Sequence, residues 1–219
     1  MEIKVLENIL GTNDALAGEN ADLFAEKKIF VVNLMASPGA GKTTFILESI
    51  ARLRDDFSIA VIEGDIASQV DAEKIREQGV PSVQINTGGA CHLEADMIKK
   101  ALSHVDLEGT DLIIIENVGN LVCPAEFKLG EDLKVMILSI PEGDDKPLKY
   151  PLIFSEVDGL VLSKIDTLLS FDFSMDRLYE VVSKLNKEVE IMPLSCKTGE
   201  GVERWIDWVK AKIEAKIGG

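Results

Sequence analysis

The sequence predicts a three-layer α/β fold in which a mainly parallel sheet of about seven strands is flanked by helices. Short aliphatic runs alternate along the chain with segments of helical periodicity, which is typical of βαβ crossovers. Hydrophobic residues make up 46% of the chain and aromatic residues only 5%, a composition that suits strands buried on both faces. Because the chain has 219 residues, we expect a single domain.

Each expected element follows from its local pattern. Apolar residues at helical spacing predict a helical leader over residues 1–26, with its helix at 2–26, ahead of a domain over 27–219. Aliphatic runs place strands at 29–36, 57–64, 80–86, 111–118, 132–140, 157–166 and 188–195. Helical periodicity places helices near 42–54, 70–78, 92–104, 174–187 and 201–216. The stretch rich in Pro and Gly at 140–147 is expected to be an excursion from the domain and not a linker.

The composition argues against several classes of partner. The net charge of −15 would repel phosphate backbones and anionic lipids, so we expect neither nucleic acid nor a membrane as partner. No apolar run approaches the length of a bilayer span, and the first residues lack the basic start of a signal peptide, so a cytoplasmic location is expected. Three cysteines in a reducing compartment do not suggest a disulfide framework. They remain to be explained as packing, reactive thiols or metal ligands.

A phosphate-binding loop is predicted at residues 36–43, which fit the pattern G-x-x-x-x-G-K-[ST] except at Ala36. The motif follows a strand and opens a helix, which favours a P-loop over an ordinary glycine-rich turn that caps a helix. Lys42 is expected to reach the β- and γ-phosphates, Thr43 to bind Mg²⁺, and Thr44 to contact the α-phosphate. The remaining nucleotide-binding residues expected from this loop are Ser37, Pro38, Gly39, Ala40 and Gly41.

Carboxylates at the ends of two other strands are candidate Mg²⁺ ligands. Asp65 ends the second expected strand, and Glu116 ends the fourth. Glu63, two residues before Asp65, is expected to take part in nucleotide binding together with it. Asp65 could instead cap a helix, and Glu116 could be an ordinary acid at a strand end. The spacing from Glu116 to Gly119 resembles the D-x-x-G switch of GTPases, so Lys42, Glu116 and Gly119 are the expected catalytic groups.

Base recognition is expected after the last two strands. Residues 162–166 resemble the N-K-x-D motif, in which the aspartate, here Asp166, accepts two hydrogen bonds that guanine can donate and adenine cannot. The stem of Lys164 would lie across the base, whereas an isolated Asp166 would more simply be a turn residue. Ser163 replaces the usual asparagine, which removes an amide that helps to hold the P-loop. Ser195, Cys196 and Lys197 resemble the S-A-K motif, and together these segments predict GTP rather than ATP.

Cys91, His92 and Cys123 follow the third and fourth strands and should therefore lie at the nucleotide edge of the sheet. Taken alone this is a weak metal signal, because a buried cysteine is usually a small hydrophobic residue. Three soft ligands are too few for a closed tetrahedral site, which suggests a water ligand or a site shared across a two-fold axis. Cys196 and His104 are not expected to be ligands.

Together these segments resemble the HypB family of hydrogenase nickel-incorporation GTPases over almost the whole chain. The matching segments are SPGAGKTT, VIEGDIASQVDAEKIREQG, INTGGACHLEADMI, IIIENVGNLVCPAEFKLGE and SKID. The resemblance implies a SIMIBI-class GTPase that forms a homodimer with GTP and holds zinc or nickel at the dimer interface through Cys91, His92 and Cys123. It also implies two partners, a small zinc-containing nickel carrier and the large-subunit precursor of a nickel-iron hydrogenase. The chain has neither the family's N-terminal cysteine cluster nor a histidine-rich stretch, so a weak, switchable nickel site is expected rather than storage.

The predicted function is therefore a GTP-hydrolysing metallochaperone for nickel insertion, with slow intrinsic turnover because no arginine finger is evident. Three alternatives stay open: a chaperone for urease or a cobalamin-dependent mutase, a small-molecule kinase with the same P-loop, and a metal-binding assembly module with vestigial GTPase activity. Asp166 argues against a small-molecule kinase. The Cys91-His92 and Cys123-Pro124 pairs argue against a chaperone for urease or a cobalamin-dependent mutase.

Overall fold

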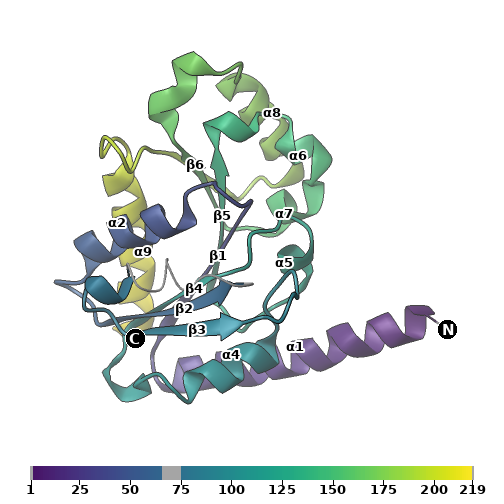
Figure 1. Cartoon of the computed structure of the whole chain (residues 1–219), viewed down its shortest axis with the longest axis vertical. Coiled ribbons are helices and arrows are strands. Elements are labelled where there is room, and N and C mark those ends of the chain that lie inside the picture. Colours follow the sequence, from purple (N-terminus) through teal and green to yellow (C-terminus); the bar gives the residue numbers. More distant parts are fainter. Residues whose placement is uncertain (1, 66–74, 219) are drawn as a thin grey trace.

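The computed structural model describes residues 2–65 and 75–218, apart from the side chains of residues 2–9 and of Asp65 (Figure 1). Within this part of the chain, seven strands form one parallel sheet in the order β3-β2-β4-β1-β5-β6-β7. The strands are β1 Phe30–Ala36, β2 Ile59–Asp65, β3 Ser82–Asn86, β4 Leu112–Glu116, β5 Leu133–Ser139, β6 Gly159–Ser163 and β7 Glu190–Pro193. The predicted fold class is confirmed, and every predicted strand is present.

The helices cover both faces of the sheet, so the fold has three layers (Figure 1). They are α1 Glu2–Glu26, α2 Lys42–Leu53, α4 Ala95–Leu102, α5 Cys123–Glu126, α6 Lys146–Lys149, α7 Pro151–Glu156, α8 Met175–Leu185 and α9 Val202–Ile217, with short 3₁₀ turns η1 Leu107–Gly109, η2 Ile140–Glu142 and η3 Ile165–Ser170. The helix predicted near 70–78 falls mostly on residues 66–74, outside the described part; residues 75–77 are helical. The helices α5, α6 and α7 were not predicted, because four to six residues are too few to show a helical period.

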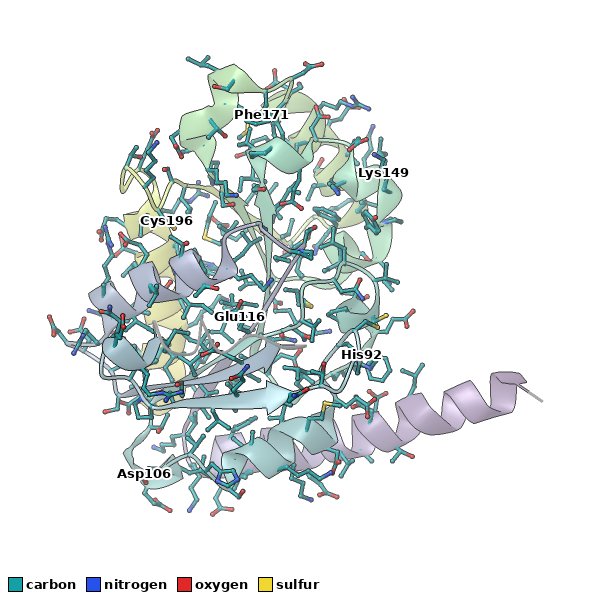
Figure 2. All side chains as sticks on the ribbon, in the orientation of Figure 1. His92, Asp106, Glu116, Lys149, Phe171 and Cys196 are labelled. Carbon is teal, nitrogen blue, oxygen red and sulfur yellow. The ribbon has the colours of Figure 1, made fainter. Side chains whose placement is uncertain are left out.

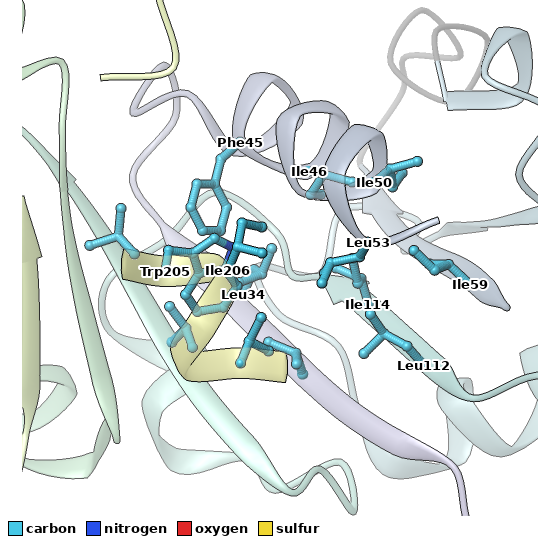
Figure 3. Close-up of a cluster of buried hydrophobic side chains, with 14 of the residues drawn as sticks. Leu34, Phe45, Ile46, Ile50, Leu53, Ile59, Leu112, Ile114, Trp205 and Ile206 are labelled. Carbon is cyan, nitrogen blue, oxygen red and sulfur yellow. The ribbon is translucent and has the colours of Figure 1, made fainter. Parts of the chain in front are cut away.

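One face of the sheet is covered by α2 and α9 (Figure 3). Alternate residues of β1, such as Val32 and Leu34, point into this layer, because successive side chains of a strand face opposite sides. Phe45 of α2 packs against Trp205 of α9 with ring centroids 4.9 Å apart. The layer therefore fixes α2, and with it the loop between β1 and α2, against the sheet.

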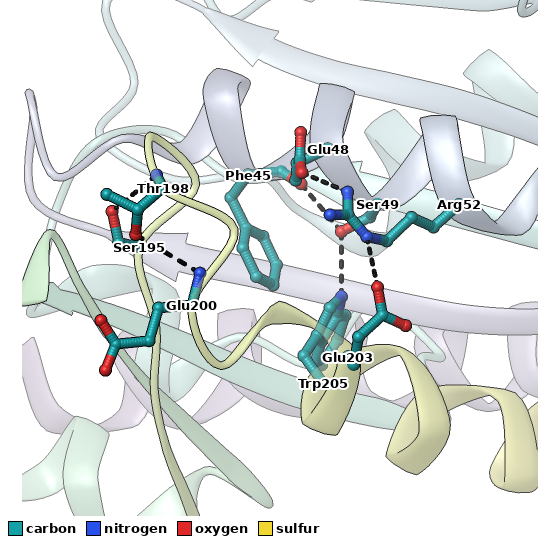
Figure 4. A network of polar contacts seen from close by, with 9 residues as sticks. All are labelled: Phe45, Glu48, Ser49, Arg52, Ser195, Thr198, Glu200, Glu203 and Trp205. Carbon is teal, nitrogen blue, oxygen red and sulfur yellow. Dashed lines mark hydrogen bonds and ion pairs between the residues drawn. The ribbon is translucent and has the colours of Figure 1, made fainter.

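Polar contacts reinforce the α2–α9 layer (Figure 4). The indole nitrogen of Trp205 donates a hydrogen bond to Ser49 Oγ at 2.9 Å, and both residues are buried. At the surface, Arg52 pairs with Glu48 of its own helix and, at 2.9 Å, with Glu203 of α9.

The opposite face is covered by α1 and α4 on one half and by α7 and α8 on the other. The predicted leader helix is confirmed: α1 runs beside α4, and its first turns extend beyond the domain (Figure 1). Two buried asparagines attach it. Asn20 donates to the carbonyl oxygens of Ala95 at 2.9 Å and Leu129 at 3.0 Å, and Asn13 accepts from the Ala95 amide at 2.9 Å. In the described residues, we find no helix with the length and apolar character that a bilayer span requires.

Candidate nucleotide and metal site

The loop between β1 and α2 has the backbone geometry of a phosphate-binding loop. Gly39 and Gly41 have φ angles of 77° and 104°, a left-handed region that favours glycine. Ala36, by contrast, is the last residue of β1, where it is fully buried in strand register with Ile137. An alanine adopts strand geometry without strain, so the departure from the motif at Ala36 does not disturb the loop.

A cavity of about 580 Å³ opens over this loop at the carboxyl edge of the sheet. Glu63 and Glu116 lie opposite each other on the paired strands β2 and β4, and only 4% and 8% of their surfaces are exposed. Two buried carboxylates that line the same cavity as Lys42 make a site that favours a cation and its anionic ligand. The cavity is lined by Pro38, Gly39, Gly41, Lys42, Thr43, Thr44, Glu63, Gly64, Glu116, Asn117, Val118, Gly119 and Lys164.

Two predicted residues are less well defined here. Asp65 ends β2 at the same edge, but its side chain lies outside the described residues. Ser37 belongs to the loop, where its carbonyl oxygen accepts from the Ala40 amide at 3.3 Å, and it does not line the cavity.

Gly119 packs directly on the phosphate loop. A Cβ atom added there would lie 3.0 Å from Pro38 Cγ and 3.1 Å from the Pro38 nitrogen. Any larger residue would push the two segments apart, so the space between residues 117–119 and the loop is set by a glycine. Residues 117–119 are therefore in direct contact with the phosphate loop, so a ligand bound in that loop can shift their position.

A second cavity, of about 310 Å³, adjoins the first at Gly41, Thr44 and Lys164. Its acidic group is Asp166, whose Oδ1 accepts a hydrogen bond from the buried Ser195 hydroxyl at 2.6 Å. Lys197 Nζ lies 3.9 Å from the other carboxylate oxygen. The remaining residues around this cavity are Ala40, Ser163, Thr167 and Cys196. The two segments predicted to bind a nucleotide base, 162–166 and 195–197, therefore meet around the Asp166 carboxylate beside the phosphate loop.

Ser163 contacts the phosphate loop although it lacks the amide of the usual asparagine. Its hydroxyl donates to the Ala40 carbonyl oxygen at 2.9 Å. Next to it, Lys164 Nζ donates to the Gly39 carbonyl oxygen at 2.8 Å. A serine hydroxyl can therefore do what an asparagine amide would do, because β6 ends close enough to the loop for a short side chain to reach it.

Cys91, His92 and Cys123 form a cluster in which one ligand atom of each lies within 4.8 Å of the others. The two sulfur atoms are 2.9 Å apart, and Cys91 Sγ lies 3.6 Å from His92 Nδ1. The hydrogen bond with Cys91, together with burial, raises the pKa of the Cys123 thiol. Two thiols and one imidazole at this spacing fit zinc or nickel, and three donors leave at least one coordination position for a further ligand.

Two loops bring this cluster together. Cys91 and His92 follow the turn after β3, in which Gly88 and Gly89 have positive φ angles, and Cys123 is the first residue of α5. The side-chain Nδ2 of Asn120 donates a hydrogen bond to the Cys91 carbonyl oxygen at 3.2 Å and so joins the two loops. In the view of Figure 2, Glu116 lies between His92 and Cys196. This agrees with the Cys91–His92–Cys123 cluster (the metal cluster) and the second cavity (the base cavity) lying on either side of the first cavity.

The other cysteine and histidine are not part of the cluster. Cys196 lines the base cavity, where burial raises the pKa of its thiol to about 11, and His104 follows the end of α4. Among the described residues, Cys91, His92 and Cys123 are the only group of three or more His, Cys, Asp or Glu side chains close enough together to hold a metal ion.

Sequence reasoning missed Asn117. Its side chain is fully buried and accepts hydrogen bonds from the amides of Leu93 at 3.2 Å and Val118 at 2.9 Å. The available signal was an amide residue directly after a buried aliphatic strand and next to Glu116.

Comparisons with known proteins point to one family. A family model described as "CobW/HypB/UreG, nucleotide-binding domain" matches residues 30–193. The hydrogenase maturation factor HypB of Escherichia coli K12 is 43% identical over 212 residues, which cover 97% of this chain and 72% of that protein. The hydrogenase/urease maturation factor HypB of Helicobacter pylori J99 is 42% identical over 96% of this chain and 88% of its own length. The crystal structure of H. pylori HypB in complex with nickel superposes with a TM-score of 0.89, at 40% identity over 94% of this chain and 97% of that one.

Proposed function

Because this chain belongs to the HypB hydrogenase maturation factors of the CobW/HypB/UreG family, we propose that it is a GTP-hydrolysing metallochaperone that assists nickel insertion into nickel-iron hydrogenase. The observation that carries the proposal is the course of residues 117–123. At one end Gly119 packs on Pro38 of the phosphate loop, and at the other Cys123 lies 2.9 Å from Cys91. One short segment therefore contacts both the nucleotide cavity and the metal cluster.

GTP is the proposed nucleotide. The carboxylate of Asp166, held by Ser195, would accept the two hydrogen bonds that the guanine edge donates, whereas adenine would make neither of them. Lys42 and the backbone amides of the loop would hold the phosphates. Thr43, Asp65 and Glu116 would hold Mg²⁺, which supplies charge neutralisation at the γ-phosphate.

Hydrolysis would require a water molecule positioned in line with the γ-phosphate, with the Gly119 amide free to contact the phosphate oxygens. The residues that line the two nucleotide cavities include lysines but no arginine in the described part of the chain. Without an arginine to stabilise the developing charge, intrinsic turnover is expected to be slow.

Nickel or zinc is the proposed metal. Three donors from one chain leave the coordination incomplete, and a second copy related by a two-fold axis would supply more thiolates and imidazoles at the exposed Cys91. We therefore propose a homodimer that GTP and metal promote. A small zinc-containing nickel carrier would deliver the ion, and the hydrogenase large-subunit precursor would receive it. Urease is the second candidate client, because the H. pylori relative is a hydrogenase/urease maturation factor.

Two measurements test the proposal. Phosphate release from GTP should be slow but measurable, should exceed release from ATP, and should be lost in Lys42→Ala; Lys184→Ala, which changes an exposed lysine of α8, is the matched control. Nickel titration should give one site that Cys91→Ala removes. Equal hydrolysis of GTP and ATP, or full hydrogenase activation by Lys42→Ala, would contradict the proposal in favour of a kinase or a passive assembly module.

A further inference from the structure

The buried amide of Asn117 joins the loop that carries the metal cluster to the segment that faces the phosphates. Its Oδ1 accepts from the amide of Leu93, the residue after His92, and from the amide of Val118, the residue before Gly119. Its Nδ2 donates to Asn33 Oδ1 of β1 at 3.2 Å. A single side chain thus holds the amide of Val118 together with the amide of Leu93, which lies 24 residues before Asn117 in the sequence.

The side-chain amide of Asn117 belongs to a short chain of hydrogen bonds. Its orientation is fixed because one end of that chain is a carboxylate, which only accepts, and the other end consists of backbone amides, which only donate. At one end, the Glu131 carboxylate accepts from Asn33 Nδ2 at 3.1 Å and from the Leu129 amide at 2.7 Å. At the other end, the Leu93 and Val118 amides can only donate. Asn33 must therefore turn its oxygen to Asn117, and Asn117 must turn its oxygen to the two backbone amides.

We infer that Asn117 is the positioning residue through which nucleotide state changes the geometry of the metal cluster; the inference rests on the proposed function. If a γ-phosphate draws the Gly119 amide toward the loop, the adjoining Val118 peptide moves. The Val118 amide shares one acceptor oxygen with the Leu93 amide, so the backbone beside His92 moves as well. Because the side chain is fully buried, water cannot easily replace either bond.

A second contact joins the same loops, from the Asn120 amide to the Cys91 carbonyl oxygen, but it is exposed. Water can readily replace an exposed hydrogen bond, so a movement of one loop is passed to the other less effectively through it than through a buried bond. The coupling is therefore assigned to Asn117.

The test measures the nickel affinity of the purified full chain with GDP and Mg²⁺ and again with a non-hydrolysable GTP analogue. For the native chain we expect the two affinities to differ by about 5-fold or more. In Asn117→Ala the ratio should fall to about 2-fold or less, while GDP binding and thermal unfolding show that the variant is folded. Asn20→Ala is the matched control, because it removes another buried asparagine that joins α1 to α4, and it should keep the native ratio.

A charge-balanced pair of variants sharpens the test. Asn117→Asp keeps acceptors for Leu93 and Val118 but turns a second acceptor toward Asn33 Oδ1, so the ratio should fall. Adding Glu131→Gln supplies a donor at the far end, which lets Asn33 turn over and reverses the two side-chain hydrogen bonds of Asn33, while the backbone amides at both ends still donate. The double variant has the native net charge and should regain the nucleotide dependence.

Each other outcome rejects a defined statement. A native chain that binds nickel equally well in both nucleotide states shows no coupling between the nucleotide cavity and the metal cluster, and it contradicts the joint role of residues 117–123 on which the proposed function rests. A native ratio that survives in Asn117→Ala, or one that Asn20→Ala also abolishes, refutes only the role of Asn117. If the ratio of nickel affinities in the double variant does not exceed the ratio in Asn117→Asp, the polarity argument on which that role depends is refuted.

Discussion

The hydroxyl of Ser163 donates a hydrogen bond to the carbonyl oxygen of Ala40 at 2.9 Å, across 123 residues of sequence. The bond joins the end of β6 to the phosphate loop, and both groups are buried. A loop that must present its amides to phosphate needs its carbonyl groups held away from them, and this contact holds one of those carbonyl groups.

Loss of this contact should weaken nucleotide binding. Ser163→Ala leaves the buried Ala40 carbonyl oxygen without this donor, at a cost of about 1 kcal/mol, so GDP should bind about 5-fold more weakly. Ser163→Asn should bind at least as well as the native chain. Calorimetric titration with GDP measures both, with Ser183→Ala on the exposed face of α8 as control. Native affinity in Ser163→Ala would show that the loop holds its shape without β6.

Asp166 should decide which base is bound. Asp166→Asn presents an amide donor where guanine also donates, so GTP affinity should fall by about 100-fold or more. Xanthosine triphosphate, which carries an oxygen in place of the guanine amino group, should gain affinity in the same variant. Competition binding with the two nucleotides checks this, with the exposed Asp172→Asn as control. Unchanged selectivity would remove the base cavity from the proposal.

Nickel binding should depend on Cys91 and not on His104. Cys91→Ala removes one of three clustered donors, and stoichiometric binding should be lost. His104→Ala changes the other histidine of the chain, outside the cluster, and should leave the titration unchanged. The absorbance of nickel–thiolate bonds provides the readout. Equal losses in both variants would indicate that nickel binds elsewhere.

Cys196 should make the folded state less stable at high pH. Burial raises the pKa of its thiol from 9.0 to about 11, so between these values the unfolded chain has lost the proton and the folded chain keeps it. Raising the pH across this window therefore favours unfolding. Because the thiol is partly exposed, the loss should be at most about 1 kcal/mol.

The comparison with Cys196→Ala isolates this contribution, because the variant keeps every other titrating group. Guanidinium denaturation in the presence of a reductant, at pH about 8 and about 10.5, should show the native chain losing more stability than the variant. If both lose the same amount, the thiol titrates normally in the folded state.

Many features were predictable because they depend on a few neighbouring residues. Aliphatic runs such as 112–115 identify buried strands, and a strand, a glycine-rich turn and Lys42 identify the phosphate loop by local geometry alone. The short helices α5, α6 and α7 were not predicted, because each has too few residues to show a helical period.

The shared edge of the sheet was also predictable, because parallel strands bring the loops that follow them to one side. The prediction that Cys91, His92 and Cys123 come close needed only that rule. That their ligand atoms all lie within 4.8 Å of one another, however, depends on β3, β2 and β4 lying side by side, an order that their sequence positions do not state.

By itself, then, the sequence determined the type of each main element, the positions of the nucleotide motifs and the edge at which they meet. Only the tertiary structure decided that Ser163 reaches Ala40 and that Asn117 connects Leu93, Val118 and Asn33. Such contacts join distant parts of the chain, so they depend on strand order and register. A slip of one residue in a strand would turn its side chains to the other face and remove them.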